Sequence, residues 1–236
     1  MTASGRPPNQ LLQMLDAADF ALLQPHLSTV AMARATILGE QGARQKQVYF
    51  PHDGAVSMTV SLAEGQTIAV ALLGRDSVIG GGAALADGLA LTDTTVLFPC
   101  TAAVLDLAVF RNAADASARF HRMVARHEQA LLAHVQQSLL CNTLHPVEAR
   151  LSRWLLRARD LCDRAALPLT QELLAEMIGV RRNAVSIVAH TLQQTGIIRY
   201  SRGQIEIIDA EALAAMSCEC HDTVKMQYER LLMTGP

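Results

Sequence analysis

The chain has 236 residues, half of them apolar, which is enough for one large or two small domains with buried cores. No stretch reaches ~18 uninterrupted apolar residues, so the sequence predicts no membrane-spanning helix. The net charge of −2 on its own argues against a nucleic-acid partner. The first ten residues lack the charged-then-apolar order of a signal peptide, and the five cysteines are odd in number and scattered. Both features predict a reducing, cytoplasmic location.

The first half of the chain is dominated by short β-rich runs. An amphipathic helix is predicted over Asn9–His26, and from Val30 to Phe110 apolar runs alternate with turn residues. Strands this short and evenly spaced predict a sandwich or barrel. The predicted strands are Thr36–Leu38, Gln47–Phe50, Ala55–Ser61, Thr67–Leu73, Ser77–Ile79, Thr94–Phe98 and Ala102–Leu107.

One long helical pattern follows, from Ala113 to Asn142, and it ends before His145-Pro146. The residues of one face recur at alternating spacings of four and three, as in the seam of a coiled coil. This face predicts a parallel homodimer. A second face, marked by Leu132, Val135 and Leu139, is expected to pack on the β domain. The seam residues are Phe120, Val124, His127, Leu131, His134, Ser138 and Cys141.

Two histidines in this seam, His127 and His134, lie one heptad apart. At a dimer axis, two subunits could offer four imidazoles to a metal ion, a haem or a pH-sensitive contact. The simpler interpretation is that they are polar residues on a partly wet seam and help to fix its register.

The C-terminal half shows the pattern of a winged helix-turn-helix. Pro146–Leu161 is a helix with Leu151, Trp154 and Leu155 inward. Within Leu169–Asp209, Thr170 can cap a first helix that Gly179 ends, because glycine adopts positive φ without steric cost. A second helix is predicted from about Arg181 to Thr195. Strands over Ile197–Tyr200 and Gln204–Ile208 then surround the turn Ser201-Arg202-Gly203.

The second helix carries a polar N-terminal face that suits DNA. Such an end enters a major groove, where its side chains donate to phosphates and base edges. Arg202, at the hairpin tip, is placed to contact the phosphate backbone. Residues 145–208 contain nine arginines and six acidic residues, a local charge of +3 that offsets the objection from net charge. The face consists of Arg181, Arg182, Asn183 and Ser186.

The stretch LTQELLAEMIGVRRNAVSIVAHTLQQTGIIRYSRGQIEI is similar to the DNA-binding domain of the Crp/Fnr family of bacterial transcription regulators. The resemblance implies that Thr170 and Gln171 contact phosphate and that Arg182, Asn183 and Ser186 read bases. Asn183 stands where the family's best-studied members have a base-reading glutamate, and Ile187 stands where many have an arginine. The family's usual TGTGA or TTGA half-site is therefore not expected.

The resemblance extends over essentially the whole chain. It implies an α+β protein with a β jelly-roll sensor domain (1–112), a dimerisation helix (113–142) and a winged helix-turn-helix domain with a C-terminal helix (146–236). The implied partners are double-stranded DNA, read as a pseudo-palindrome, and a second copy of the chain, with RNA polymerase as a further candidate. No membrane partner is expected.

The family's cyclic-nucleotide-binding fold raises the question of an effector. The family's phosphate-binding arginine and serine fall on Thr92 and Asp93, and a carboxylate there would repel a phosphate. We therefore expect no cyclic AMP or GMP, and an unknown small molecule as effector. The Gly80-Gly81-Gly82 run could cradle a ligand through backbone amides or be only a turn. The candidate pocket residues are Gly80, Gly81, Thr92, Asp93, His127 and His134.

No cofactor or metal site is predicted. The cysteine cluster near the N-terminus of the family's oxygen sensor has no counterpart before Cys100, which argues against an iron–sulfur cluster. Cys218-Glu-Cys-His221 falls within a helix predicted over Ala210–Leu232. On a helix Cys218 and His221 share a face while Cys220 points elsewhere, so one chain would offer at most two close ligands. The two cysteines are then either an inert pair of small residues or part of a metal or redox site between two chains.

Three other classes of protein are alternatives to a ligand-gated regulator. An enzyme is disfavoured because no nucleophile–base pair or metal motif of recognisable spacing occurs. A non-DNA signalling module with a cyclic-nucleotide-binding fold is disfavoured by Arg181, Arg182, Asn183 and Arg202. An effector-independent, constitutively DNA-binding regulator remains a competing interpretation.

Overall fold

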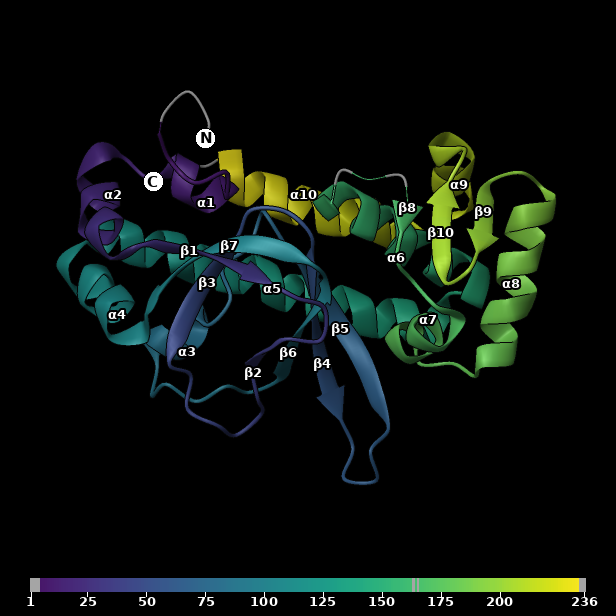
Figure 1. The fold of residues 1–236 in the computed structure, drawn as a ribbon, viewed down its shortest axis with the longest axis horizontal. Helices are drawn as coiled ribbons and strands as arrows, with labels where there is room; N and C mark the ends of the chain where they lie inside the picture. Colours follow the sequence, from purple (N-terminus) through teal and green to yellow (C-terminus); the bar gives the residue numbers. More distant parts are fainter. Residues whose placement is uncertain (1–4, 163, 165, 234–236) are drawn as a thin grey trace.

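The computed structural model describes residues 5–162, 164 and 166–233. The N-terminal half is a β domain flanked by helices, and the C-terminal half is a small α+β module (Figure 1). A long helix, α5 (Ala118–Leu144), runs between them, as expected for an α+β chain of this organisation.

The β domain consists of two antiparallel sheets with strand orders β1-β7-β3 and β2-β6-β4-β5. Its strands are β1 (Ser28–Met32), β2 (Ile37–Gly39), β3 (Gln47–Pro51), β4 (Ala55–Ser61), β5 (Thr67–Leu73), β6 (Asp93–Phe98) and β7 (Cys100–Asp106). The predicted jelly-roll-like domain is confirmed. The run Ser77–Ile79 is not a strand, since only Ile79 forms a single bridge, with Tyr49.

The helix predicted over Asn9–His26 is three shorter elements, α1 (Gln10–Met14), α2 (Ala17–Leu23) and the 3-10 turn η1 (Gln24–His26). Asp16 causes the break between the first two. Its carboxylate accepts a hydrogen bond of 2.7 Å from the Asp19 amide and so caps a new helix start.

The long helical pattern is also divided, so the expectation of one helix from Ala113 is wrong. The helix α4 (Leu107–Ala116) ends before Ser117, which has an extended backbone. The Ser117 hydroxyl accepts from the Phe120 amide at 3.1 Å and thereby caps α5. A short helix, α3 (Gly81–Leu85), lies between β5 and β6.

The two faces of α5 are the reverse of those expected. The predicted dimer seam is mostly buried within the chain, because the β domain and the C-terminal helix α10 (Cys220–Met233) both pack on it. Of the face expected to pack on the β domain, Leu132 and Leu139 are 56% and 70% exposed, and Val135 is half-buried. Leu140 and Leu144 of the same helix are also exposed, at 43% and 70%.

The C-terminal module contains a three-stranded sheet of order β8-β10-β9 and a cluster of helices. Its further elements are α6 (Val147–Cys162), β8 (Ala166–Leu167), α7 (Gln171–Ile178), α8 (Arg182–Gln194), β9 (Ile198–Ser201), β10 (Gln204–Ile207) and α9 (Ala210–Met216). Leu151, Trp154 and Leu155 lie fully buried, as predicted. Their cluster also contains Leu72 and Phe98 of the β domain, so the two halves share a continuous core.

The helix predicted over Ala210–Leu232 is broken between Met216 and Cys220. Cys218 lies in this break and not on a helix. The expectation that Cys218 and His221 share a helical face is therefore wrong. None of the helices in the described ranges is long and apolar enough to cross a membrane.

Candidate functional site

The turn between α7 and α8 follows the pattern that the sequence predicts. The Thr170 hydroxyl accepts a hydrogen bond from the Leu173 amide at 3.2 Å and caps α7. Gly179 ends α7 with φ of 63°, and a Cβ there would lie 2.6 Å from Ile68 Cδ1 of β5. The positive φ therefore favours glycine at this turn, and a larger residue would also displace the end of the Ile68 side chain.

α8 presents the predicted polar face to solvent. Arg181, Arg182 and Asn183 are exposed at its N-terminal end, and Ser186 is half-buried one turn later. The opposite side of the helix is buried in the shared core, through Val185, Val188, Ala189 and Leu192. Packing of this apolar side therefore fixes the direction in which the polar face points.

Hydrogen bonds tie this face to α7. Arg182 Nε lies 2.9 Å from Glu172 Oε1, and the Ser186 hydroxyl donates to Gln171 Oε1 at 2.6 Å. The pKa of Glu172 is lowered by a hydrogen bond with its own backbone, and also by the charge of Arg182. Glu172 is not among the residues predicted from the sequence. The signal for it is an acidic residue in the first turn of α7, just before the arginine pair that begins α8.

The wing is a tight hairpin. Ser201 pairs with Gln204, so the turn has two residues, Arg202 and Gly203, with φ of 51° and 75°. Two positive φ values are typical of a type I′ turn, which is shorter than the predicted three-residue turn. A Cβ on Gly203 would lie 3.4 Å from Thr170 Cγ2, so the tip reaches the N-terminus of α7. Arg202 is exposed at this tip, and of the candidate DNA contacts Thr170 lies close to it.

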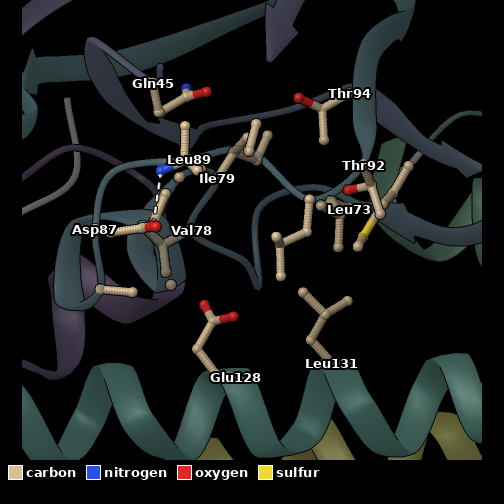
Figure 2. Close-up of a pocket in the computed structure, with 17 residues that line it drawn as sticks. Gln45, Leu73, Val78, Ile79, Asp87, Leu89, Thr92, Thr94, Glu128 and Leu131 are labelled. Carbon is tan, nitrogen blue, oxygen red and sulfur yellow. Dashed lines mark hydrogen bonds between the residues drawn. The ribbon is translucent and has the colours of Figure 1, made fainter. Parts of the chain in front are cut away.

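A second candidate site is a cavity of about 200 Å³ between the β domain and α5. Figure 2 shows Glu128 and Leu131 projecting toward it from α5, with Gln45, Thr92 and Thr94 across from them. Two of the described lining residues, Asp87 and Glu128, are acidic and none is basic. The lining thus disfavours an anionic ligand.

The structure places only some of the predicted pocket residues around this cavity. Gly80 and Thr92 line it. Gly81 does not, because a Cβ there would face Val78 and Val124 at 3.1 and 3.2 Å. Asp93 is also outside the lining, and its carboxylate accepts from the Gln41 amide at 2.8 Å.

The two seam histidines are buried within one chain. His127 Nε2 accepts from the Val78 amide at 3.3 Å, and its Nδ1 lies 3.2 Å from Glu128 Oε1. His134 Nδ1 lies 3.4 Å from the Tyr228 hydroxyl on α10. The hypothesis of four imidazoles at a dimer axis is therefore wrong, because both rings face elements of their own chain.

This architecture, a β sensor domain joined through a long helix to a winged helix-turn-helix, defines a class of regulatory DNA-binding proteins. Residues 29–117 match the family model described as cyclic nucleotide-binding domain, and residues 149–216 match the Crp-like helix-turn-helix domain. The chain belongs to the Crp/Fnr family of transcription regulators.

Solved structures of this family share the fold. FixK2 from Bradyrhizobium japonicum is 17% identical with a TM-score of 0.68, covering 81% of this chain and 98% of that one. A putative Crp/Fnr regulator from Eubacterium rectale is 16% identical with a TM-score of 0.66, covering 87% and 96%. CLP from Xanthomonas campestris, described as a c-di-GMP-responsive global regulator, is 15% identical with a TM-score of 0.65, covering 81% and 99%. Comparison with curated protein sequences gives no match.

Proposed function

We propose that this regulator binds a pseudo-palindromic operator as a homodimer, with α8 in the major groove and the wing on the phosphate backbone. The observation that carries the proposal is the exposed N-terminal face of α8, which Arg182 and Ser186 tie to the start of α7, where the tip of the wing also lies close to Thr170. Thr170 and Gln171 at the start of α7 are assigned to phosphate, as the family resemblance implies. Because its target is chromosomal DNA, the protein acts in the cytoplasm. RNA polymerase remains a predicted partner from the resemblance alone.

We assign the recognition of bases to Arg182, Asn183 and Ser186, and we add Ile187 to this set. Arg182 can form a bidentate contact with guanine and Asn183 with adenine. Ile187 is 68% exposed one turn into α8, and an aliphatic side chain there suits the methyl group of thymine. These side chains support a DNA half-site that differs from the half-sites of family members with glutamate at the position of Asn183 and arginine at the position of Ile187.

The exposed leucine face of α5, defined by Leu132, Leu139, Leu140 and Leu144, is assigned to the dimer contact. Leu132 and Leu139 are one heptad apart, and four exposed leucines on one helix make a candidate contact surface. A second copy with the same face would cover it. Two-fold symmetry would then place two α8 helices about one DNA turn apart, roughly 34 Å.

The cavity beside α5 is assigned to a neutral or cationic effector. Asp87 and Glu128 in its lining would repel the phosphates of a cyclic mononucleotide, and equally those of the c-di-GMP to which CLP responds. Since Glu128 belongs to α5, a ligand that pairs with it would act directly on the helix that carries the leucine face. This arrangement supports an effector other than a cyclic nucleotide.

A second candidate is a regulator that needs no effector. The cavity of about 200 Å³ is smaller than the ~300–1,000 Å³ of typical ligand pockets. In that case the protein as purified would bind its operator at full affinity.

Selection of bound sequences from random duplex DNA, with the protein as purified, tests both candidates. Enrichment of a palindromic motif, bound with an affinity that falls steeply with salt, supports the homodimeric regulator. If this enrichment occurs without any added small molecule, it supports the effector-independent form. The Arg182→Ala variant is the matched control and should enrich a degenerate motif. Folded, dimeric protein that enriches no sequence, alone or with a library of neutral and cationic metabolites, would contradict the proposal.

A further inference from the structure

Four potential metal ligands meet where α5 ends. Cys141 lies in the last turn of α5, and His145, four positions later, is the residue that follows the helix end. Cys218 lies in the break between α9 and α10, and Cys220 is the first residue of α10. One ligand atom from each side chain lies within 4.8 Å of all the others. Cys141 Sγ is 3.5 Å from Cys218 Sγ, and Cys220 Sγ is 3.4 Å from His145 Nδ1.

These distances suit one tetrahedral ion. Two sulfurs bound at ~2.3 Å to a tetrahedral Zn²⁺ lie roughly 3.8 Å apart, and a sulfur and a nitrogen lie slightly closer. The separation of Cys141 and Cys218 is well above the ~2.05 Å of a disulfide. A cluster of several irons would need its ligand sulfurs spread around a larger body than this group encloses.

The surrounding side chains are placed as supports for metal ligands. His145 Nε2, the nitrogen on the far side of the ring, lies 3.5 Å from Glu219 Oε2, the carboxylate–histidine arrangement common at zinc sites. The Gln137 amide donates to Cys220 Sγ at 3.0 Å. The Glu219 contact would orient His145 and leave its Nδ1 for the metal, and the Gln137 hydrogen bond would stabilise the sulfur of Cys220 as a thiolate.

The local charge is complementary to a thiolate site. Arg150 and Arg153 of α6 are buried, and within the described part of the chain neither has a carboxylate in ion-pair range. Arg150 donates to the Ile178 carbonyl, and Arg153 lies over the Trp154 ring and 3.5 Å from the Ser138 hydroxyl. Buried cations without anionic partners are costly, and a complex with a net charge of −1 nearby would reduce that cost.

We propose that Cys141, His145, Cys218 and Cys220 bind one Zn²⁺ ion per chain as a structural Cys3His site. Binding involves no change of oxidation state. Three thiols lose their protons to solvent, neutral His145 donates a lone pair from Nδ1, and the ion forms four bonds with a net charge of −1. The ion would cross-link the segment between α9 and α10 to the end of α5, next to the turn that leads into α6.

The proposal is tested on the full chain by metal analysis and by titrating the thiol-reduced, metal-free protein with Co²⁺ and Zn²⁺. We expect one zinc per chain, tetrahedral cobalt bands with thiolate-to-cobalt charge transfer, and a thermal midpoint that rises on zinc addition. Cys220→Ser should lose most of the charge transfer and bind weakly. Cys162→Ser and His221→Gln are matched controls, since they change a buried cysteine and a neighbouring histidine outside the cluster.

A variant that leaves every ligand in place keeps the test independent of folding defects. Glu219 is exposed, so Glu219→Gln should fold normally yet bind zinc ~10–100-fold more weakly, the usual effect of losing a supporting partner. The proposal would be overturned if folded, reduced protein binds no zinc. It would also be overturned if neither Cys220→Ser nor Glu219→Gln changes the affinity for zinc. A Cys141–Cys218 disulfide in protein that binds no ion would also overturn it. None of these readouts involves DNA, so the metal site and the proposed function fail separately.

Discussion

Arg182 on α8 and Glu172 on α7 form an exposed ion pair between the first turns of the two helices of the helix-turn-helix, with Arg182 Nε 2.9 Å from Glu172 Oε1. The pair holds the guanidinium of Arg182 beside the first turn of α7. An exposed pair of this kind contributes little to stability, so it can be exchanged for a base contact at small cost. Glu172 also places a negative charge where phosphates are expected, so it opposes indiscriminate binding.

Arg182→Ala should weaken binding to the selected operator by ~1–3 kcal/mol and relax the preference at one base pair per half-site, because a bidentate guanine contact contributes on that scale. Competition binding with single-base operator variants measures both effects. Glu172→Gln is the informative companion, and it should tighten binding to every duplex while preserving the motif. Equal losses on all sequences with Arg182→Ala would assign this residue to phosphate.

Arg202→Ala should weaken binding to all duplexes to a similar extent and reduce the slope of log K against log salt by ~1, the contribution of one phosphate contact. The reason is its place at the two-residue tip of the wing, near Thr170. Arg199→Ala is the control, because Arg199 is already paired with Glu206 at 2.7 Å. A changed base preference in the Arg202 variant would contradict the assignment of the wing to the backbone.

The helix-turn-helix could be predicted closely because its signals are local. The cap at Thr170, the positive φ of Gly179 and the buried positions of α8 each depend on a few neighbouring residues. The Arg202-Gly203 turn was placed correctly for the same reason, although it is shorter than predicted.

Features that depend on contacts distant in sequence could not be predicted. The periodicity of α5 shows that a face is apolar but not which element covers it, and α10 lies about ninety residues further along the chain. The four-ligand cluster has the same origin, because Cys141 and Cys218 are 77 residues apart and the helix break that frees Cys218 was not recognised. Of the expected pocket residues, Thr92 follows from the resemblance and Gly80 from the glycine run, whereas the place of Glu128 depends on how α5 is rotated.

Leu139→Asp should convert the dimer to a folded monomer and abolish operator binding, because Leu139 is 70% exposed within the leucine face of α5. Burying a carboxylate in a symmetric contact is unfavourable on both subunits. Sedimentation and circular dichroism check mass and folding together. Leu131→Asp is the matched comparison: Leu131 lines the cavity, so this change should disturb the β domain without separating the subunits. A dimer that persists in the Leu139 variant would place the interface elsewhere.

Stability should fall as the pH drops below about 6.5, and His134 should account for part of the fall. Burial lowers the pKa of His134 well below its ordinary value of 6.5, and the nearby charges of Arg157 and Arg153 on α6 lower it further. Its ring contacts the Tyr228 hydroxyl on α10, and in the described structure its Nε2 has no hydrogen-bond partner. The folded state therefore keeps this imidazole neutral while the unfolded chain protonates it.

The sign follows from proton counting. Above pH 6.5 neither state binds the proton, and the stability is at its full value. Below pH 6.5 the unfolded state binds more protons, so the free energy of unfolding decreases by up to about 1.4 kcal/mol per pH unit for one such group. Urea unfolding at pH 7.5 and 5.5 should show this loss, and His134→Gln should reduce the difference between the two. Some slope should remain, because burial also lowers the pKa values of His52 and His221. An unchanged slope in the His134 variant would mean that the ring is protonated in the folded protein as readily as in the unfolded chain.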